Sequence, residues 1–353
     1  MHRIRDTRGF ELVPFVYSSE LFGKYLNKKC TNFGAFKPQA FYSLTTGLAF
    51  PIAAKRASAK ADLVHATDHL IPCLPKVPVI ATLMDAIPLA HPEWVTHSFR
   101  GIKNSLWRRS GGWADHVVTI SEHAKKELVE WFRLPEEKIT VTPLGVDHRW
   151  FVSPDQSDSD RVNAEYSLPG KFFLFVGTLQ PRKNVARLIA AHRLLPHALR
   201  HEFPLVIIGR AGWECDAEVA ALNEGDNGAL RWLRYVPDKD LIPLVSSATA
   251  LVFPSLHEGF GLPLLEAFAA GTPVLSSNAT SLPEVAGDAA LLFDPKKPNE
   301  IAEAMKLLIK NESLAGQLVA RGRQRAMLFT WERTAQMTAE LYRQVLGATQ
   351  AGK

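Results

Sequence analysis

Short apolar runs alternate with longer amphipathic segments along the C-terminal half of this sequence. The runs have strand length and are rich in β-branched and large apolar side chains; they cover residues 172–176, 205–208, 250–253 and 274–276. Strands that alternate with helical segments predict parallel βαβ units. We therefore expect a doubly wound α/β domain over residues 153–330.

The rest of the chain is predicted to form a second domain and a final helix. The length of 353 residues, with 46% hydrophobic residues, suits two globular domains. An interdomain linker is predicted near Trp150 to Arg161, where residues 153–160 are polar and turn-forming and Asp158 and Asp160 are expected to be solvated. We expect an N-terminal domain over 1–152 and a helix over 331–353.

Composition excludes several classes of protein. The sequence has neither eighteen consecutive apolar residues nor a charged-then-apolar leader, so the expected location is the cytoplasm. Three scattered cysteines, Cys30, Cys73 and Cys215, argue against a disulfide framework and a structural zinc site.

The N-terminal half is basic. Residues 1–150 hold 20 Lys and Arg against 14 Asp and Glu, a net charge of +6. No nucleic-acid-binding motif accompanies this charge, so contact with an anionic membrane is the favoured interpretation. Residues 99–109 have apolar side chains at helical spacing with basic residues between them, a pattern that fits an interfacial helix. A core-facing helix has the same pattern. The apolar residues are Phe99, Ile102, Leu106 and Trp107, and the basic ones are Arg100, Lys103, Arg108 and Arg109.

A glycine-rich turn over 257–266 predicts an anion site. A helix should begin near Leu262 or Pro263 and end before Gly271, which leaves the preceding backbone N–H groups free to meet a phosphate. Glu258 and Glu266 would repel a bare anion, so we expect them to contact the hydroxyl groups of a sugar nucleotide. Taken alone, each of these features would also suit an ordinary turn and helix.

A second loop follows the first predicted strand of this domain. It reads Phe175-Val-Gly-Thr-Leu-Gln-Pro-Arg-Lys-Asn184. Arg182 and Lys183 could neutralise a departing nucleoside diphosphate, or could cap a solvated helix start.

These segments, in this order, resemble the retaining glycosyltransferases of family 4 (glycosyl transferases group 1). Glu258 and Glu266 resemble the Glu-x7-Glu signature, residues 175–184 the donor-phosphate loop, and residues 114–121 and 142–147 the segments before the linker. The resemblance implies the GT-B fold, with two Rossmann-like domains facing across a cleft. The form of residues 181–184 is similar to that of bacterial polysaccharide mannosyltransferases.

The resemblance also implies roles for individual residues. Glu258 would hold the donor sugar near the reacting carbon, Glu266 would hold the ribose, and Asp85 would act with them. The implied catalytic residues are Glu258, Arg182, Lys183 and Asp85, and the implied donor-binding residues are Gly177, Thr178, Arg182, Lys183, Val236, Glu258, Gly259, Phe260, Gly261, Leu262 and Glu266.

The sequence departs from the family in two places. Met84 stands before Asp85 where many relatives have histidine, which leaves His65 and Ser121 as candidates for the acceptor or sugar side. The N-terminal domain also lacks an opening strand with a glycine-rich loop, which fits a misplaced start, a truncated chain or a lineage without that loop; in a truncated chain we expect a free sheet edge there.

The combined prediction is a retaining hexosyltransferase that needs no metal or cofactor. It would move a hexose, with mannose from GDP-mannose favoured, to a glycan or lipid-linked acceptor in cell-surface polysaccharide or lipopolysaccharide synthesis, at the inner face of the cytoplasmic membrane and without nucleic acid. The alternative is a catalytically impaired partner protein that binds sugar nucleotides. A dinucleotide-dependent oxidoreductase is disfavoured, because no Gly-x-Gly-x-x-Gly motif opens a helix with an acidic residue about twenty positions later.

Overall fold

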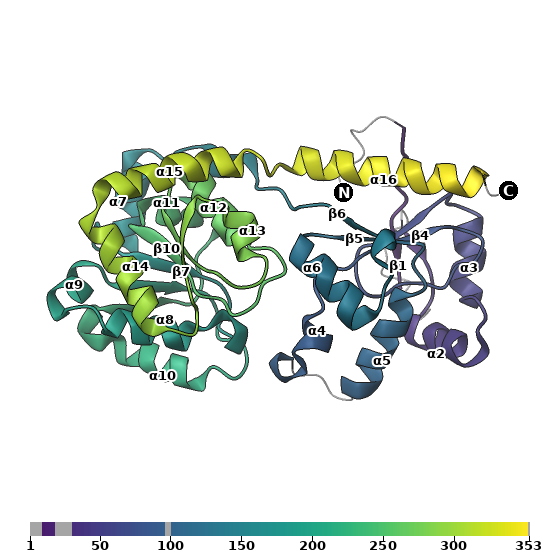
Figure 1. Cartoon of the computed structure of the whole chain (residues 1–353), viewed down its shortest axis with the longest axis horizontal. Coiled ribbons are helices and arrows are strands. Elements are labelled where there is room, and N and C mark those ends of the chain that lie inside the picture. Colours follow the sequence, from purple (N-terminus) through teal and green to yellow (C-terminus); the bar gives the residue numbers. More distant parts are fainter. Residues whose placement is uncertain (1–8, 18–29, 96–99, 352–353) are drawn as a thin grey trace. The chain divides into compact units, whose positions relative to one another are not determined.

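The computed structural model describes residues 9–17, 30–95 and 100–351 (Figure 1). The chain forms two compact units: unit 1 comprises Met1–Pro143 and Glu332–Lys353, and unit 2 comprises Leu144–Trp331. The first boundary therefore precedes the predicted one at residues 152 and 153. Compactness alone does not test independent folding, so the predicted domain limits stay a prediction.

Unit 2 is built on a six-stranded parallel sheet in the order β12-β11-β10-β7-β8-β9. The four predicted strands are all present, and two further strands, β9 and β12, lie at the two edges of the sheet. The strands are β7 (Phe173–Val176), β8 (Leu205–Ile208), β9 (Leu230–Leu233), β10 (Ala250–Phe253), β11 (Val274–Ser277) and β12 (Ala290–Phe293).

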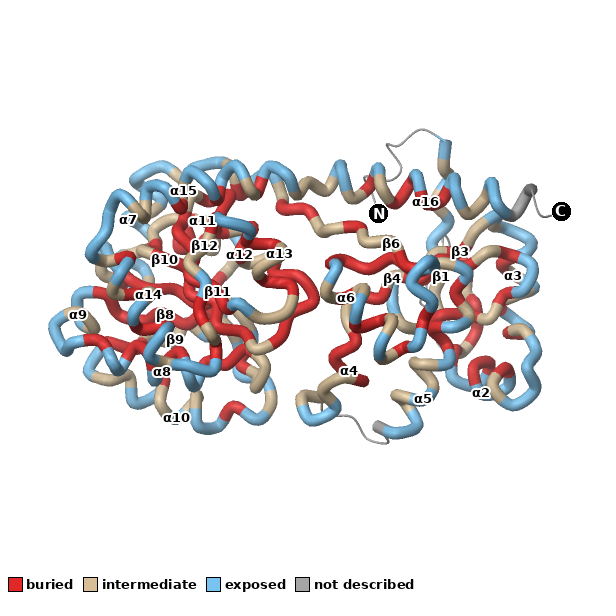
Figure 2. The backbone as a smooth tube through the Cα atoms, in the orientation of Figure 1, coloured by how far each residue is buried: buried red, intermediate tan, exposed pale blue. Residues whose placement is uncertain are grey.

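Helices cover the sheet of unit 2, and its strands form the buried interior (Figure 2). The first strand, β7, lies between β8 and β10, so the strand order reverses at β7. Open parallel sheets bind ligands at the carboxyl ends of the strands at such a reversal. The helices are α7 (Gln156–Glu165), α8 (Val185–Arg193), α9 (His197–Glu202), α10 (Asp216–Glu224), α11 (Asp238–Ser247), α12 (Leu262–Ala270), α13 (Leu282–Ala286), α14 (Pro298–Lys310) and α15 (Glu312–Ala326).

The predicted linker was wrong, because much of it is helical. Asp155 caps α7: its Oδ1 accepts a hydrogen bond from the backbone N–H of Asp158 at 2.8 Å. Arg161 of α7 donates to the buried Asp240 of α11 at 2.8 Å, and the hydroxyl of Tyr166 donates to the same carboxylate at 3.0 Å. The capping residue after Pro154 was the overlooked helix signal.

Unit 1 contains a four-stranded parallel sheet in the order β3-β4-β5-β6 and a two-stranded parallel sheet, β1-β2. The final helix, α16, packs Leu341 and Tyr342 against Ile80 and Val118. The strands are β1 (Phe15–Val16), β2 (Thr31–Asn32), β3 (Val64–Ala66), β4 (Val79–Thr82), β5 (His116–Thr119) and β6 (Ile139–Val141), and the helices are α2 (Phe36–Thr46), α3 (Pro51–Ser58), α4 (Ile87–Ala90), α5 (Arg100–Gly111), α6 (Glu122–Glu127) and α16 (Trp331–Ala351).

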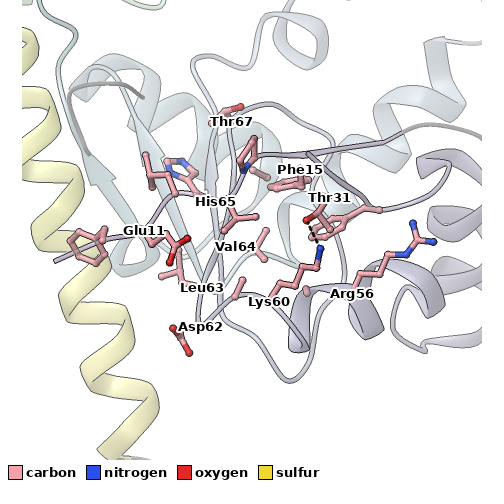
Figure 3. Close-up of a pocket in the computed structure, with 18 of the residues that line it drawn as sticks. Glu11, Phe15, Thr31, Arg56, Lys60, Asp62, Leu63, Val64, His65 and Thr67 are labelled. Carbon is pink, nitrogen blue, oxygen red and sulfur yellow. Dashed lines mark hydrogen bonds between the residues drawn. The ribbon is translucent and has the colours of Figure 1, made fainter. Parts of the chain in front are cut away.

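A cavity of about 880 Å³ lies between the two sheets of unit 1 (Figure 3). Residues 9–17, which include β1, line one side, and residues 62–68, which include β3, line another. In unit 2, strand β7 pairs with both β8 and β10 and so joins the two halves of one sheet. In unit 1, β1–β2 and β3–β6 form two separate sheets, and the cavity lies between them. Within the described ranges the outer edge of β3 has no strand partner, and this is the free edge that the sequence led us to expect.

The segment predicted as an interfacial helix forms α5, but it faces inward. Leu106 and Trp107 pack against the hydrophobic core of unit 1, and only Ile102 of its large apolar side chains is highly exposed among the described residues. Phe99 lies outside the described residues. The packing of Leu106 and Trp107 favours the core-facing interpretation of α5, and membrane contact through this helix stays a prediction. None of the described helices is long and apolar enough to span a bilayer.

Candidate active site

The loops that follow β7 and β10 meet at the point where the strand order of unit 2 reverses. β7 and β10 are neighbours in the sheet, so their carboxyl ends open at the same place. The backbone N–H of Leu256 donates to the carbonyl of Arg182 at 2.8 Å, which joins the two loops. This contact brings the predicted phosphate loop beside the predicted Glu-x7-Glu segment.

Arg182, Lys183 and Glu258 form a largely buried ion triad. Lys183 Nζ lies 2.6 Å from Glu258 Oε1, and Arg182 Nη1 lies 2.8 Å from Glu258 Oε2. Arg182 Nη1 also donates to the carbonyl of His257 at 3.0 Å. Lys183 Nζ also lies over the ring of Phe253, at the end of β10, 4.8 Å from the ring centre. The structure thus joins three residues that the sequence singled out in two separate segments.

The triad carries one more positive than negative charge when all three groups are ionised. Burial alone would raise the pKa of Glu258, but the charges of Lys183 and Arg182 outweigh burial and hold that pKa below its ordinary value. Burial lowers the pKa of Lys183, and the neighbouring Glu258 carboxylate opposes this effect. A partly desolvated excess of positive charge is suited to a diphosphate, which can form charge-assisted hydrogen bonds to both cations.

Glycines allow the loops after β7 and β8 to approach each other closely. A Cβ atom on Gly209 would lie 1.9 Å from the carbonyl oxygen of Gly177, and both glycines have positive φ angles that few other residues adopt. Two backbone bonds of 2.9 Å, from Leu179 N to the Arg210 carbonyl and from Gly212 N to the Leu179 carbonyl, continue the contact. Contacts with the loop after β8 therefore help to hold the predicted donor-phosphate loop in place.

Three polar side chains to which the sequence assigned no individual role fix the backbone of the site. Thr280 Oγ1 accepts from the backbone N–H of Glu258 at 3.1 Å, and Ser281 Oγ lies 2.8 Å from the carbonyls of Glu258 and Phe260. Asn184 donates to the carbonyl of Pro254 at 3.0 Å, across the two loops. These contacts join segments far apart in the sequence, and no local pattern indicated them.

The helix α12 begins and ends where the sequence predicted. Gly261 precedes its first residue, Pro263 lies in its first turn, and Gly271 ends it in the left-handed conformation. The first turn of a helix leaves backbone N–H groups without intrahelical acceptors and carries partial positive charge, which favours a phosphate near residues 259–262.

Glu266 lies on α12 in a very different environment from Glu258. Burial raises its pKa to about 7, and the charge of Arg149 opposes the rise. A carboxyl group that titrates near neutral pH can change between hydrogen-bond donor and acceptor within the physiological range. The relation of Arg149 to Glu266 could not be read from the sequence, because the two residues belong to distant segments.

This raised pKa predicts a pH-dependent stability. The pKa of Glu266 is 4.5 in its ordinary state and about 7 in the folded protein. The stability that the Glu266 carboxyl group contributes to the folded protein is therefore fully present below pH 4.5 and is lost as the pH rises through 7. Relative to Glu266→Gln, the free energy of unfolding of the wild type should fall by about 3 kcal/mol over this range. Urea unfolding at a series of pH values measures this difference.

The exposed Glu303, which pairs with Lys306, provides the matched control for this measurement. The difference between wild type and Glu303→Gln should not depend on pH in this way. A flat difference for Glu266→Gln would show that its carboxyl group is not held protonated by burial.

Val236, one of the implied donor-binding residues, follows β9. Val236 is buried, whereas Tyr235 is 63% exposed and has the Arg210 guanidinium 5.4 Å from the centre of its ring. No described contact joins Val236 to the ion triad, so its role stays a prediction.

The remaining site candidates lie in unit 1 and have structural contacts there. Both ring nitrogens of His65 are hydrogen-bonded, to Tyr342 at 2.6 Å and to Thr82 at 2.7 Å. Ser121 caps α6 by accepting from Ala124 N at 3.0 Å.

Asp85 accepts a hydrogen bond from Ile87 N at 3.1 Å, beside an exposed Met84. This contact lies at the start of α4 and does not test the expected catalytic role of Asp85, so that role stays a prediction.

Comparison with known proteins supports the interpretation of both units. Residues 157–325 match the family described as glycosyl transferases group 1, and residues 7–150 match glycosyltransferase family 4. O-antigen chain mannosyltransferase B of Escherichia coli is 36% identical over 229 residues, which cover 64% of this chain and 60% of that protein. The serotype-specific mannosyltransferase WbdA of Escherichia coli is 32% identical over 241 residues, 67% of this chain and 30% of that protein. The chain thus spans less than two thirds of either relative.

Solved structures show the same fold. HepE from Anabaena aligns with a TM-score of 0.72 at 17% identity, over 94% of this chain and 92% of that one. Sucrose-phosphate synthase from Thermosynechococcus elongatus aligns with a TM-score of 0.67 at 24% identity, over 88% and 80% of the two chains. The two parallel-sheet units and these likenesses define a protein of the GT-B fold. The chain belongs to the family 4 (group 1) glycosyltransferases.

Proposed function

We propose that this protein is a retaining glycosyltransferase that moves mannose from GDP-mannose to a glycan or lipid-linked acceptor. The observation that carries the proposal is the triad of Arg182, Lys183 and Glu258 at the strand-order reversal of unit 2. Two cations beside a glycine-lined helix start suit a nucleoside diphosphate. The mannosyltransferase names of the relatives favour mannose as the sugar.

The proposed chemistry begins with a change of ionic partner in the triad. The diphosphate replaces Glu258 as the anionic partner of Arg182 and Lys183, and the Glu258 carboxylate then accepts hydrogen bonds from the donor sugar. As the bond between the anomeric carbon and the phosphate oxygen breaks, its electron pair goes to the diphosphate, where both cations stabilise it. The acceptor hydroxyl forms the new bond on the same face and gives its proton to a phosphate oxygen.

The other predicted residues have supporting roles in this proposal. Backbone N–H groups of residues 259–262 meet the phosphate and the sugar, Glu266 holds the ribose hydroxyls, and Val236 lies beside the base. Gly177 and Thr178 shape the phosphate loop. The proposed catalytic role of Asp85, and those of His65 and Ser121 on the acceptor side, rest on the family resemblance alone.

The cations of the triad would perform the task that a divalent metal performs in other transferases, so the proposed reaction needs no metal. We also propose that the protein works at the cytoplasmic face of the membrane, in cell-surface polysaccharide or lipopolysaccharide synthesis. Contact with anionic lipid would bring it to a lipid-linked acceptor.

A transfer assay tests this proposal. Purified protein is incubated with radiolabelled GDP-mannose, UDP-glucose or ADP-glucose and a membrane lipid extract, with and without EDTA, and the product's anomeric configuration is determined by NMR. Incorporation from GDP-mannose that survives EDTA and retains the α-configuration is expected. Incorporation from UDP-glucose alone would contradict the donor, and inversion would contradict the mechanism.

The alternative is a sugar-nucleotide-binding partner without turnover, and Met84 is the observation that favours it. Its thioether cannot replace the hydrogen bonds of a histidine. This alternative predicts GDP-mannose binding with neither transfer nor hydrolysis.

A further inference from the structure

Unit 1 exposes four large apolar side chains within a short stretch of sequence. Phe41 is 70% exposed, Leu48 56%, Ile52 40% and Tyr42 39%. Single exposed apolar residues are common on protein surfaces, but a concentration of them marks an interaction site. We call the surface formed by α2, α3 and the loop between them the α2–α3 surface.

The two helices of this surface are tied together. Gln39 Oε1 accepts hydrogen bonds from the backbone N–H groups of Ile52 and Ala53, both at 3.0 Å, and Gln39 Nε2 donates to the carbonyl of Phe33 at 2.8 Å. Figure 1 shows α2 and α3 as neighbours within unit 1. The apolar side chains therefore project from a preformed support.

The outward side of α2 carries apolar side chains among polar ones, and these apolar side chains are not needed for the core of unit 1. Phe36, Ala40 and Ser43 are buried, and Lys37, Phe41 and Thr45, which follow one another at intervals of four residues, are exposed. Phe41 thus has no packing role in unit 1 comparable to that of Phe36.

The charge of this surface has one sign. Residues 30–61 contain Lys37, Lys55, Arg56 and Lys60 and no acidic residue. Lys37, Lys55 and Lys60 are exposed. Basic side chains among exposed aromatic and aliphatic ones are typical of proteins that lie at the surface of an anionic bilayer.

We infer that the α2–α3 surface binds an anionic phospholipid bilayer. Phe41, Tyr42 and Leu48 enter the headgroup boundary, and the lysines contact lipid phosphates. A second copy of the chain is a poorer partner, because two such basic surfaces repel each other. This inference rests on the proposed function, because a transferase with a lipid-linked acceptor needs to reach the membrane. It places the membrane contact on α2 and α3 rather than on α5.

Vesicle co-sedimentation tests the inference. The full chain is mixed with phosphatidylcholine vesicles with and without phosphatidylglycerol, at low and high salt. We expect wild type to bind the anionic vesicles and to be released by salt, and Phe41→Ser with Leu48→Ser to reduce partitioning at least about tenfold. Lys37→Glu with Lys55→Glu should abolish the preference for phosphatidylglycerol.

Two matched controls each remove one exposed apolar side chain elsewhere. Ile102→Ser changes α5 and Leu307→Ser changes α14 of unit 2, where the side chains are 72% and 48% exposed. Both should bind vesicles as wild type does. All the substituted residues are exposed, so thermal unfolding should change little and confirms that each variant folds.

Several outcomes would overturn the inference. They are absence of wild-type binding to anionic vesicles, unchanged binding of the Phe41 and Leu48 variant, or an equal loss in Ile102→Ser. Loss of a dimer in light scattering, with vesicle binding unchanged, would assign the surface to a second copy. No nucleotide is present, so failure here leaves the donor-site proposal untouched, and loss of GDP binding would leave this inference untouched.

Discussion

Replacement of Glu258 by glutamine should lower kcat by about two to three orders of magnitude, with GDP affinity kept within about tenfold. Glutamine has the shape of the carboxylate but not its charge, so it loses the charge-assisted hydrogen bonds that the donor sugar needs in the transition state. Arg182 and Lys183 remain to bind the diphosphate. Steady-state kinetics and calorimetric titration with GDP measure the two quantities separately.

The matched control is Glu300→Gln, since Glu300 pairs with Lys297 at the protein surface. It should have wild-type kcat and GDP affinity. A fully active Glu258→Gln enzyme would contradict the role of this carboxylate, and equal loss of GDP affinity and kcat would make Glu258 a binding residue only.

Replacement of Lys183 by alanine should weaken GDP binding by at least about a hundredfold, because a desolvated cation that contacts the diphosphate is lost. It should also lower the free energy of unfolding by about 3 kcal/mol, since the buried Glu258 keeps only Arg182 as an ionic partner. Titration calorimetry measures the first effect and urea unfolding the second.

Lys183→Met separates charge from packing, because its side chain can still cover the ring of Phe253. We expect it to lose GDP binding as the alanine variant does. Lys171→Ala, which removes a surface lysine paired with Glu202, should change neither quantity. Tight GDP binding by Lys183→Met would show that the lysine charge does not hold the diphosphate.

The central strands of unit 2 could be predicted from the sequence, because strands buried on both faces are continuous apolar runs. Strands β7 and β10 are of this kind. The edge strands were missed. Strand β9 includes Arg231, which interrupts its apolar run, whereas β12 is itself a continuous apolar run that was left unassigned. Helix α12 was predicted with its limits, since Pro263 and Gly271 act locally.

The site was predicted as residues but not as an ion triad. The sequence assigned Arg182 and Lys183 to phosphates and Glu258 to a sugar, and it contained no sign that these groups neutralise one another. Pairing across distant segments depends on which strands are neighbours, and that follows from the sheet order. His65 also shows this limit, because the contacts that hold its ring come from β4 and α16.

The most direct test of the central claim is thermal stabilisation of the purified protein by GDP, UDP and ADP and by their sugar conjugates, without and with EDTA. A ligand that is present at a hundredfold excess over its Kd should stabilise the fold by about 2.7 kcal/mol. We predict a selective shift with GDP and GDP-mannose that survives EDTA and is lost in Lys183→Ala. No shift with any nucleotide, or an equal shift in Lys183→Ala, would contradict a donor site at the triad.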